Sequence, residues 1–583
     1  MAIENLITDH LDLWTAAVRP KSSAGRGASS KLELTGIKKL RELILELAVR
    51  GKLVPQDPSD EPASVLLERI AAEKARLVKE KKIKKSKALP EISEEEKPFE
   101  LPEGWIWARL NDLGDWGAGA TPTRSNSDFY GGNIPWFKSG ELTSDYIFKS
   151  EESVTELALS KSSLRYNDVG DVLVAMYGAT IGKTAILGVK ATTNQAVCAC
   201  TPFDGFSNLY LLQLLKAYRP RLIGMGAGGA QPNISKDKII ATIVALPPFN
   251  EQKRIVSKID DLMTLCDQLE QRSESQLAAH QTLVETLLAT LTDSADSDEL
   301  AQNWARLSTH FDTLFTTEAS IDALKQTILQ LAVMGKLVPQ DPSDEPASAL
   351  LARIAAEKAL LVKEKKIKKE KPLPAISEDE KPFELPKGWE CARLGAYSHV
   401  FAGNAFKSED FNNEAGTKVI KITNAGVNIF IETDDYLPVE FSEIYSQYQV
   451  FEGDLILALT RPYISSGLKI SICPKGYHES LLNQRVAAIR ALDETGFTFL
   501  FLRSPVVLKY YQQRFGGSGL QPNLKMSDVT DLFIAVPPKT EQHRIVAKVD
   551  ELMALCDQLK SRLQTSQQTQ LALAESLAEG ALA

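Results

Sequence analysis

A long internal repeat constrains this chain more than any other feature of its sequence. The segment Leu47–Leu110 recurs as Leu331–Leu394, with roughly 53 of 64 positions identical. A second repeated pair begins at Pro247 (PPFNEQKRIVSKIDDLMTLCDQL) and at Pro537 (PPKTEQHRIVAKVDELMALCDQL). Solenoid repeats have periods of about 20–50 residues, whereas this period is nearly half of the 583-residue chain. The chain is therefore a duplicated half-molecule and not a solenoid.

Two variable blocks, Asn111–Leu246 and Gly395–Val536, lie between the repeated segments and barely resemble each other. They share three short landmarks: Gly170-Asp171 and Gly453-Asp454, Asn194-Gln195 and Asn483-Gln484, and the glycine-rich stretches Gly226–Asn233 and Gly516–Asn523. Binding residues often lie on variable loops that a rigid scaffold positions. The pattern therefore indicates one constant frame that carries two different recognition domains.

Each Pro-Pro pair precedes a long amphipathic segment. Its apolar residues alternate at spacings of four and three, which is typical of a coiled coil. They are Ile255, Ile259, Leu262, Cys266 and Leu269 in the first copy, and Ile545, Val549, Leu552, Cys556, Leu559 and Leu563 in the second. A continuous helix over Glu251–Thr292 would be about 60 Å long. We expect the two apolar seams to pack on each other as a long antiparallel helical pair.

Shorter helices are predicted elsewhere in the repeated segments. They are Ile37–Val49 and Ile321–Val333, ended by Gly51 and Gly335, and a helix from Ala63 to about Lys85. The Gly/Ser-rich stretch Lys21–Ser30 is typical of a flexible linker. The lysine-rich run Lys79–Lys87, repeated at Lys363–Lys371, could contact phosphate, but a solvated helix end is the better interpretation.

The variable blocks contain short β-branched and aromatic runs broken by Gly, Pro and Asn, which predicts strand-rich α/β domains. Helices are predicted within them at Ser207–Lys216 and Phe497–Phe515. The fold class is therefore α+β, with two strand-rich domains held apart by long helices about a pseudo-two-fold axis. The predicted organisation is 1–101 helical with a linker, 102–246 first recognition domain, 247–385 central helical region, 386–536 second recognition domain and 537–583 final helix.

Motifs that would indicate catalysis are incomplete in this chain. Tyr177–Thr184 resembles a phosphate-binding loop but has tyrosine where the first glycine is required, and a strand-like run follows it. Pro247–Phe249 resembles the Pro-Pro-aromatic part of an amino-methyltransferase motif, but Leu246 occupies the position of the essential Asn or Asp. Six histidines and six cysteines show no metal-ligand spacing. We therefore expect no catalytic residue, no metal site and no cofactor in this chain.

Polar residues suited to base edges remain, since Asn and Gln pair with adenine, and Arg and Lys with guanine. Asn and Gly beside them could equally well serve only to form turns. The candidate DNA-binding residues of the first block are Lys138, Ser139, Tyr177, Thr180, Lys183, Asn194, Gln195, Gln231, Asn233 and Lys236. Those of the second block are Lys421, Thr423, Asn424, Thr460, Arg461, Asn483, Gln484, Arg485, Gln521, Asn523 and Lys525.

This layout resembles the DNA-specificity subunit of type I restriction–modification enzymes over essentially the whole chain. The stretch GAGATPTRSNSDFYGGNIPWFKSGEL, from Gly117 to Leu142, is similar to the family's opening pattern of Gly-x-Thr-Pro, Tyr-Gly-Gly and Ile-Pro-Trp. Gly229–Ser235 and Pro247-Pro-x-x-Glu-Gln-x-Arg254 resemble later landmarks. The second half departs from the opening pattern, because Gly403-Asn-Ala-Phe406 replaces Gly-x-Thr-Pro and no Ile-Pro-Trp follows.

The resemblance implies a non-catalytic protein that recognises a bipartite double-stranded DNA target with one domain per half-site. Its helices would act as a ruler and dock two methyltransferase subunits, and restriction subunits would complete the complex. S-adenosylmethionine, ATP and magnesium would then belong to those partner subunits. Two alternatives stay open on the residues alone: a scaffold that binds no DNA, and a self-contained DNA-modifying enzyme.

Charge and hydropathy fit a subunit that works in a complex. A net charge of -9 argues weakly against a nucleic-acid partner when taken alone. Roughly -7 of it lies outside the two variable blocks, so we expect the isolated chain to bind DNA weakly and with a modest salt dependence. The sequence contains no apolar run near the ~18 residues of a membrane span, its first residues lack the pattern of a secretory signal, and its cysteines form no disulfide framework. These features predict a cytoplasmic protein.

Overall fold

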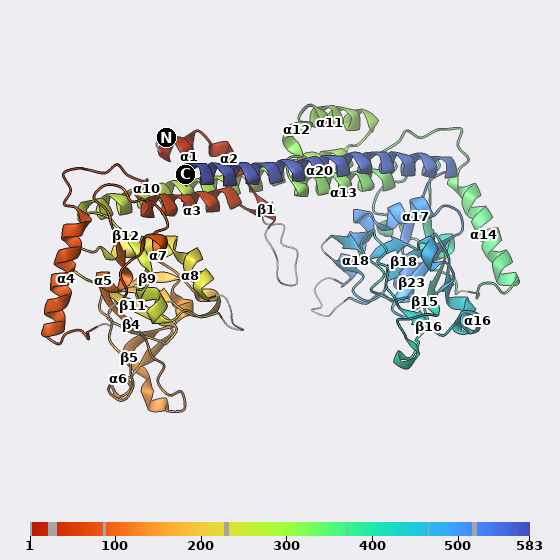
Figure 1. Cartoon of the computed structure of the whole chain (residues 1–583). Coiled ribbons are helices and arrows are strands. Elements are labelled where there is room, and N and C mark those ends of the chain that lie inside the picture. The colour runs from red at the N-terminus through yellow and green to blue at the C-terminus, as the bar shows by residue number, and fades with distance from the viewer. Residues whose placement is uncertain are drawn as a thin grey trace. The chain divides into compact units, whose positions relative to one another are not determined.

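The computed structural model describes residues 3–20, 32–85, 89–226, 232–369, 371–464, 466–515 and 522–582 (Figure 1). The linker predicted at Lys21–Ser30 lies outside these residues. The chain forms two compact units. Unit 1 consists of Met1–Arg19, Leu32–Glu274 and Gln567–Ala583, and unit 2 consists of Pro20–Lys31 and Ser275–Ser566.

The helical frame follows the predicted boundaries closely. The repeat forms α3 (Thr35–Val49) and α4 (Ala63–Lys79) in unit 1, and α13 (Glu318–Val333) and α14 (Ala347–Lys363) in unit 2. Gly51 ends α3 with φ +68° and Gly335 repeats this with φ +70° after α13, because glycine adopts the left-handed conformation without strain. The helix α4 ends earlier than predicted because Lys81 takes φ +57° directly after it.

The two long helices are each continuous. The first, α10 (Phe249–Asp293), begins in unit 1 and ends in unit 2, and the second, α20 (Lys539–Leu582), begins in unit 2 and ends in unit 1. In unit 2 the α20 residues Ile545 and Val549 share one hydrophobic cluster with Val284 and Leu288 of α10. This confirms that the long helices pack together.

In each unit a shorter helix also packs against the long helices, α3 in unit 1 and α13 in unit 2. The sequence analysis did not predict this packing. The same cluster of unit 2 contains Ile321 and Leu324 of α13, and the Lys325 ammonium of α13 pairs with Asp557 of α20. In unit 1 the Arg41 guanidinium of α3 lies 2.6 Å from Asp267 of α10. The short repeat helices also carry an apolar face, so burying it beside the seams removes more apolar surface from water than a two-helix arrangement would.

A lysine of the repeated segment caps the C-terminal end of each long helix. The Lys52 ammonium donates to the Leu582 carbonyl of α20 at 2.8 Å, and the Lys336 ammonium donates to the Thr292 carbonyl of α10 at 2.9 Å. Basic side chains stabilise the last carbonyls of a helix, which have no partner within the helix. The two units therefore repeat the same contact, each at the C-terminal end of a different long helix.

The duplication also extends further toward the N-terminus than the sequence comparison detected. Helices α1 (Ile3–Thr8) and α2 (Leu11–Ala16) correspond to α11 (Ser297–Thr309) and α12 (Phe311–Leu314). In both copies a histidine lies between the two helices. The backbone amide of His10 donates a hydrogen bond to the Ile7 carbonyl, and the backbone amide of His310 donates to the Leu307 carbonyl. The only sequence signal is the weak match of HLDLW to HFDTL.

The first recognition domain is built from strands β3 to β12. A five-stranded sheet has the order β4-β11-β8-β9-β6, a three-stranded sheet the order β10-β5-β7, and β12 pairs with β3. The strands are β3 (Ile106–Arg109), β4 (Gly114–Ala118), β5 (Tyr130–Phe137), β6 (Tyr146–Ile147), β7 (Glu152–Val154), β8 (Val172–Ala175), β9 (Thr184–Leu187), β10 (Thr192–Thr193), β11 (Val197–Pro202) and β12 (Ile243–Leu246). The helices are α5 (Leu110–Leu113), α6 (Glu156–Lys161), α7 (Asn208–Ala217), α8 (Arg219–Gly226) and α9 (Lys236–Ile240). The predicted helix at Ser207–Lys216 is thus confirmed as α7.

The second recognition domain, β13 to β24, has a related arrangement. Its four-stranded sheets have the orders β14-β23-β18-β21 and β16-β15-β22-β17, β13 pairs with β24, and β19 pairs with β20. The strands are β13 (Glu390–Arg393), β14 (Ser398–Ala402), β15 (Thr417–Ile420), β16 (Tyr436–Leu437), β17 (Gln449–Val450), β18 (Leu455–Ala458), β19 (Tyr463–Ile464), β20 (Gly467–Leu468), β21 (Ile470–Ile472), β22 (Ser480–Leu482), β23 (Val486–Ala491) and β24 (Phe533–Val536). The helices are α15 (Leu394–Tyr397), α16 (Phe441–Ile444), α17 (Thr495–Leu502), α18 (Pro505–Phe515) and α19 (Met526–Thr530).

One predicted helix of the second domain is divided. The sequence predicts a single helix over Phe497–Phe515, whereas the structure has α17 and α18 with Arg503 and Ser504 between them. Pro505 explains the break, because proline has no amide hydrogen and is favoured at the first position of a helix.

Two cysteines of the first domain lie in its buried core. Cys198 and Cys200 lie on β11 and neither side chain is exposed. Burial raises the pKa of the Cys198 thiol to about 12, because the thiolate would lose its hydration. The thiols are therefore kept protonated and unreactive.

The same hydrogen bonds join each domain to the frame. In unit 1 the Trp105 indole and the Gln56 amide donate to the buried Glu251 carboxylate, at 3.0 and 3.2 Å. In unit 2 Trp389 and Gln340 donate to Glu541 at the same distances. Both carboxylates lie in the first turn of a long helix, where the helix dipole favours negative charge. The tryptophan of the domain and the glutamate of the frame therefore form one repeated junction.

A buried arginine holds the linker that enters each domain. The Arg393 guanidinium donates to the Pro374 and Asp531 carbonyls at 3.1 and 2.6 Å and to the Glu380 carboxylate at 2.9 Å. Arg109 repeats these contacts with Pro90, Ala241 and Glu96. Hydrogen bonds from Arg393, followed by the Ser377 amide, lower the pKa of Glu380 to about 2.

This ion pair should make unit 2 sensitive to acid. A carboxyl whose pKa is lower in the folded chain stabilises it above the ordinary pKa near 4.5, and that stabilisation is lost as the pH falls toward 2. Since the Glu380 side chain is 43% exposed, we expect Glu380→Gln to cost only about 0.2–1 kcal/mol at pH 7. Denaturant unfolding at several pH values should show that this difference disappears near pH 2–3. A cost that does not change with pH would contradict the assignment.

Candidate nucleic-acid interface

Four loops of the first domain converge through backbone hydrogen bonds. The Gly178 amide donates to the Pro232 carbonyl and the Met176 amide to the Ala196 carbonyl, both at 2.8 Å. The Gly119 amide donates to the Val197 carbonyl at 2.9 Å. These bonds join the opening loop after β4, the loop after β8, the turn before β11 and the Gln-Pro-Asn loop at one end of the five-stranded sheet.

The second domain repeats the arrangement with different side chains. The Arg461 amide donates to the Pro522 carbonyl, the Leu459 amide to the Arg485 carbonyl, both at 2.9 Å, and the Gly403 amide to the Val486 carbonyl at 3.2 Å. Each bond has its counterpart in the first domain. The shared Asn-Gln pairs and Pro-Asn residues therefore lie at these converging loops, whereas the shared Gly-Asp pairs lie at the opposite ends of β8 and β18.

A glycine in each opening loop is required by close approach. A side chain at Gly119 would collide with the Thr193 and Asn194 carbonyls, and one at Gly403 would collide with the Leu482 carbonyl. Neither glycine has an unusual backbone conformation, so the constraint is space alone. This explains why glycine begins the opening pattern in both halves although the following residues differ.

The aromatic residues of the opening pattern hold the first domain's loop in place. The Tyr130 hydroxyl donates to the Pro122 carbonyl at 2.6 Å and the Trp136 indole donates to the Ala120 carbonyl at 3.0 Å. The loop then places the Thr121 hydroxyl against the Gln195 side-chain carbonyl. Tyr-Gly-Gly and Ile-Pro-Trp are therefore supports for the Thr-Pro segment.

Arg124 lies in this region and was not among the predicted residues. Its guanidinium lies over the Tyr130 and Trp136 rings, 4.7 and 5.0 Å from their centroids, and 2.6 Å from Glu152. Hydrogen bonds from Arg124, then from Lys138, lower the pKa of Glu152 to about 2. The signal that could have found Arg124 is its place two residues after Pro122, in the loop that the aromatic residues hold.

The second domain supports its opening loop differently. The Phe406 ring packs against Phe411, Phe441 and Tyr445, with centroids 6.5, 6.1 and 5.3 Å away. An aromatic cluster thus takes the place of the tyrosine and tryptophan hydrogen bonds of the first domain. This accounts for the departure of the second half from the opening pattern.

The structure brings about half of the predicted residues to the converging loops. Those in the first domain are Tyr177, Asn194, Gln195 and Asn233, and those in the second are Thr460, Arg461, Asn483, Gln484, Arg485 and Asn523. Gln231 and Gln521 lie outside the described residues. Lys236 begins α9, three residues after the bridge of Asn233, and Lys525 directly precedes α19, two residues after the bridge of Asn523.

The Asn-Gln pairs divide their roles. The Asn194 side-chain oxygen accepts the Ala196 amide at 3.1 Å, and the Asn483 oxygen accepts the Arg485 amide at 3.4 Å. Each asparagine therefore forms the turn, as the turn interpretation predicts. The following residues, Gln195 and Gln484, are exposed.

One predicted residue, Asn424, is buried, which corrects the candidate list, and two predicted lysines form ion pairs within their domains. Asn424 is fully buried, accepts the Lys421 amide and donates to the Ile431 carbonyl and the Thr433 hydroxyl, so it cannot reach a base. The Lys421 ammonium lies 2.5 Å from Asp435, and the Lys138 ammonium lies 2.9 Å from Glu152.

Four more candidates lie elsewhere or make local contacts. Thr180 donates its hydroxyl to the Tyr177 carbonyl at 2.7 Å. Lys183 lines a cleft of unit 1, Ser139 begins a short 3₁₀ helix, and Thr423 is exposed beside the buried Asn424.

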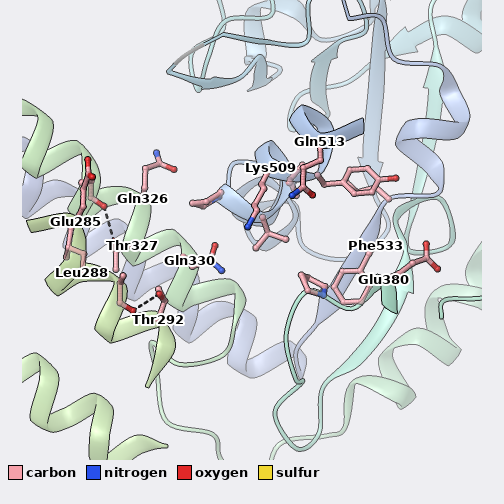
Figure 2. A pocket seen from close by; sticks show the side chains of 18 of the residues that line it. Glu285, Leu288, Thr292, Gln326, Thr327, Gln330, Glu380, Lys509, Gln513 and Phe533 are labelled. Atoms are coloured by element: carbon pink, nitrogen blue, oxygen red, sulfur yellow. Dashed lines mark hydrogen bonds between the residues drawn. The ribbon is translucent and has the colours of Figure 1, made fainter. Parts of the chain in front are cut away.

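A separate cleft of about 840 Å³ lies in unit 2 (Figure 2). Gln326 and Gln330 of α13 face Lys509 and Gln513 of α18 across it. Phe533 of β24 also lines the cleft. Besides Lys509, its only basic lining residue is Arg393, which is held by carbonyls and Glu380. The lining also includes the acidic residues Glu285, Asp379 and Glu380, so this cleft is poorly suited to a phosphate backbone.

Within the described residues, no three His, Cys, Asp or Glu side chains gather in a way that could hold a metal ion. No described helix is both long and apolar enough to cross a membrane.

Comparison with known proteins decides the family. The family model described as "Type I restriction modification DNA specificity domain" matches residues 102–279 and 386–566. The chain belongs to this family. It is 45% identical to the Escherichia coli type I restriction enzyme EcoAI specificity subunit and 43% identical to the EcoEI specificity subunit of the same species, with 100% of both chains covered in each comparison.

The chain is therefore the non-catalytic DNA specificity subunit of a type I restriction–modification system, with two target-recognition domains. A solved chain, described under complex assembly and conformational transition of the type I R-M system, is also similar. That comparison has a TM-score of 0.45 and 17% identity over 83% of this chain and 99% of the other.

Proposed function

We propose that each recognition domain of this specificity subunit binds one half of a bipartite DNA sequence. The first domain, residues 102–246, and the second, residues 386–536, would each contact bases through their four converging loops. The observation that carries the proposal is that the two domains share the same backbone bonds at these loops but differ in side chains, with Gly178 and Ala196 in one and Arg461 and Arg485 in the other.

The chemistry of the loops supports contact with base edges. The exposed glutamines Gln195 and Gln484 can pair with adenine, and the arginines of the second domain with guanine. Loops fixed by backbone bonds lose little conformational entropy on binding, which favours discrimination between bases. Lysines on the same domains would contact phosphate and fix the position of the DNA without specifying its sequence.

The remaining components of the complex would be supplied by other chains. We propose that methyltransferase subunits dock on the helical frame formed by α3, α10, α13 and α20, and that restriction subunits complete the assembly. S-adenosylmethionine, ATP and magnesium would be bound there, and the system would act in the cytoplasm. The acidic frame supports a division in which the partners provide much of the electrostatic attraction to DNA.

The proposal is tested by mapping methylated bases in cells that carry the complete system. We expect methylation of one bipartite sequence, with two specified halves and an unspecified spacer, and its disappearance when this chain is deleted. Methylation by the purified chain alone would favour a self-contained enzyme. A chain whose complex binds all DNA sequences equally would favour a scaffold role.

A further inference from the structure

Two arginines of the second domain occupy positions where the first domain has no side-chain charge. Arg461 corresponds to Gly178, because their amides donate to the equivalent carbonyls of Pro522 and Pro232. Thr460 and Tyr177, the residues before them, form the equivalent bridges to Asn523 and Asn233. The hydrogen bonds thus give the same correspondence as the shared Gly-Asp pair, which lies at the same spacing before Gly178 and Arg461.

Arg485 lies beside Arg461 on the neighbouring turn. The Leu459 amide, two residues before Arg461, donates to the Arg485 carbonyl at 2.9 Å, and the equivalent Met176 amide donates to the Ala196 carbonyl. Arg461 and Arg485 are both exposed, whereas Ala196 is buried. The second domain therefore presents two guanidinium groups on adjacent, bonded loops where the first presents none.

Arg461 takes a backbone conformation that disfavours a side chain. Its φ is +51°, and the equivalent Gly178 has φ +60°. Glycine adopts this left-handed conformation without a steric penalty, whereas arginine does not. The second domain therefore has an arginine at a position whose backbone conformation favours the glycine of the first domain.

A lysine shared by both domains provides the contrast. Lys183 and Lys469 are equivalent, because the Ala175 amide donates to the Lys183 carbonyl and the Ala458 amide donates to the Lys469 carbonyl, at 2.8 and 3.0 Å. Phosphates are the same at both half-sites, so a residue that contacts phosphate is useful in both domains. A base contact is useful only where that base occurs, so a side chain found in one domain alone is expected of a base contact.

We propose that Arg461 and Arg485 are specificity-determining residues that recognise guanine in the half-site of the second domain. The planar guanidinium group donates two hydrogen bonds to guanine O6 and N7 in the major groove, a pattern that no other base offers. The left-handed backbone at Arg461, together with the hydrogen bond from Leu459 to Arg485, fixes the direction in which the two arginine side chains project from their loops. This inference rests on the proposed function and adds a base and two residues to it.

The test compares variants of the full chain in cells that carry the complete system. Arg461→Ala and Arg485→Ala should each accept other bases at one position of the second half-site, with roughly 5- to 150-fold less discrimination and an unchanged first half-site. Methylation mapped across the genome measures both halves at once. Arg461→Gly should lose the same discrimination while its melting temperature stays equal or rises, which separates recognition from folding.

A matched control removes a charge elsewhere in the same domain. Lys475 is exposed on a 3₁₀ helix after β21, and Lys475→Ala should leave the methylated sequence unchanged. Binding of the purified complex at several salt concentrations separates base contact from phosphate contact, since losing one phosphate contact lowers the salt slope by about 1 while losing a base contact leaves it unchanged.

The outcomes distinguish this inference from the proposed function. If the wild-type chain directs no bipartite methylation, the proposed function fails. If the wild-type chain does so and both alanine variants methylate the same sequence, only the assignment of the arginines is overturned. Equal weakening at every base, together with a smaller salt slope, would make them phosphate contacts and would overturn it as well.

Discussion

Replacing residues 102–246 by a second copy of residues 386–536 should give a complex that methylates sites with the second half-site sequence at both ends. The reason is that each domain joins its frame through repeated contacts. Trp389 and Arg393 supply the same hydrogen bonds to Glu541 and Glu380 that Trp105 and Arg109 supply to Glu251 and Glu96. The frame segments that receive them are nearly identical in the two copies.

The boundaries of the exchange follow from strand pairing. In the first domain β3 pairs with β12 along four residues, from Arg109 with Ile243 to Ile106 with Leu246. In the second, β13 pairs with β24 in the same way. A cut inside either strand would separate partners, whereas cuts before Pro102 and after Leu246 keep each pair within one transferred segment.

Methylated bases mapped in cells with the exchanged subunit provide the measurement. The wild-type chain and the reciprocal exchange, residues 102–246 placed at 386–536, are the controls, and each should show a different combination of half-sites. An exchanged subunit that is folded and active but retains the original first half-site would contradict the assignment of one domain to one half-site.

Much of the frame could be predicted because its signals are local and repeated. The spacing of Ile255, Ile259 and Leu262 fixes a helix that the structure extends without interruption from Phe249 to Asp293. The packing of the two long helices on each other was predicted from their seams and is confirmed, but apolar periodicity shows which face is buried and not everything that covers it. The additional helices α3 and α13 were therefore missed as part of the packing, although both were predicted as helices.

The interface was predicted less completely because one-dimensional patterns do not separate a residue that shapes a loop from one that the loop presents. Asn194 and Gln195 are adjacent, yet the structure uses the asparagine for the turn and exposes the glutamine. Asn424 is chemically suited to adenine but is fully buried. The convergence of the loops depends on hydrogen bonds to residues more than 50 positions away in sequence, such as the bond from Gly178 to Pro232 and that from Arg461 to Pro522, and no local pattern reveals it.

The junction glutamates should be among the most destabilising positions of the chain. Glu541 is 1% exposed and accepts the Trp389 indole and the Gln340 amide at 3.0 and 3.2 Å. In Glu541→Ala both donors would lose their acceptor in a buried environment. An unsatisfied buried donor costs about 1–3 kcal/mol, so we expect unit 2 to lose about 2–5 kcal/mol of unfolding free energy. Glu541→Gln should cost less, because its amide oxygen still accepts one of the two donors.

Internal duplication supplies the matched variant. Glu251 makes the same two contacts in unit 1, so Glu251→Ala should destabilise unit 1 by a similar amount and leave unit 2 unaffected. Hydrogen exchange can follow the two separately, through the amides of the β3–β12 pair in unit 1 and of the β13–β24 pair in unit 2. The exposed Glu443→Ala should change neither. Equal loss of protection in both units from a single junction variant would show that the two junctions are not independent. A loss of unfolding free energy below about 0.5 kcal/mol would show that the junctions are not the main attachment of the domains.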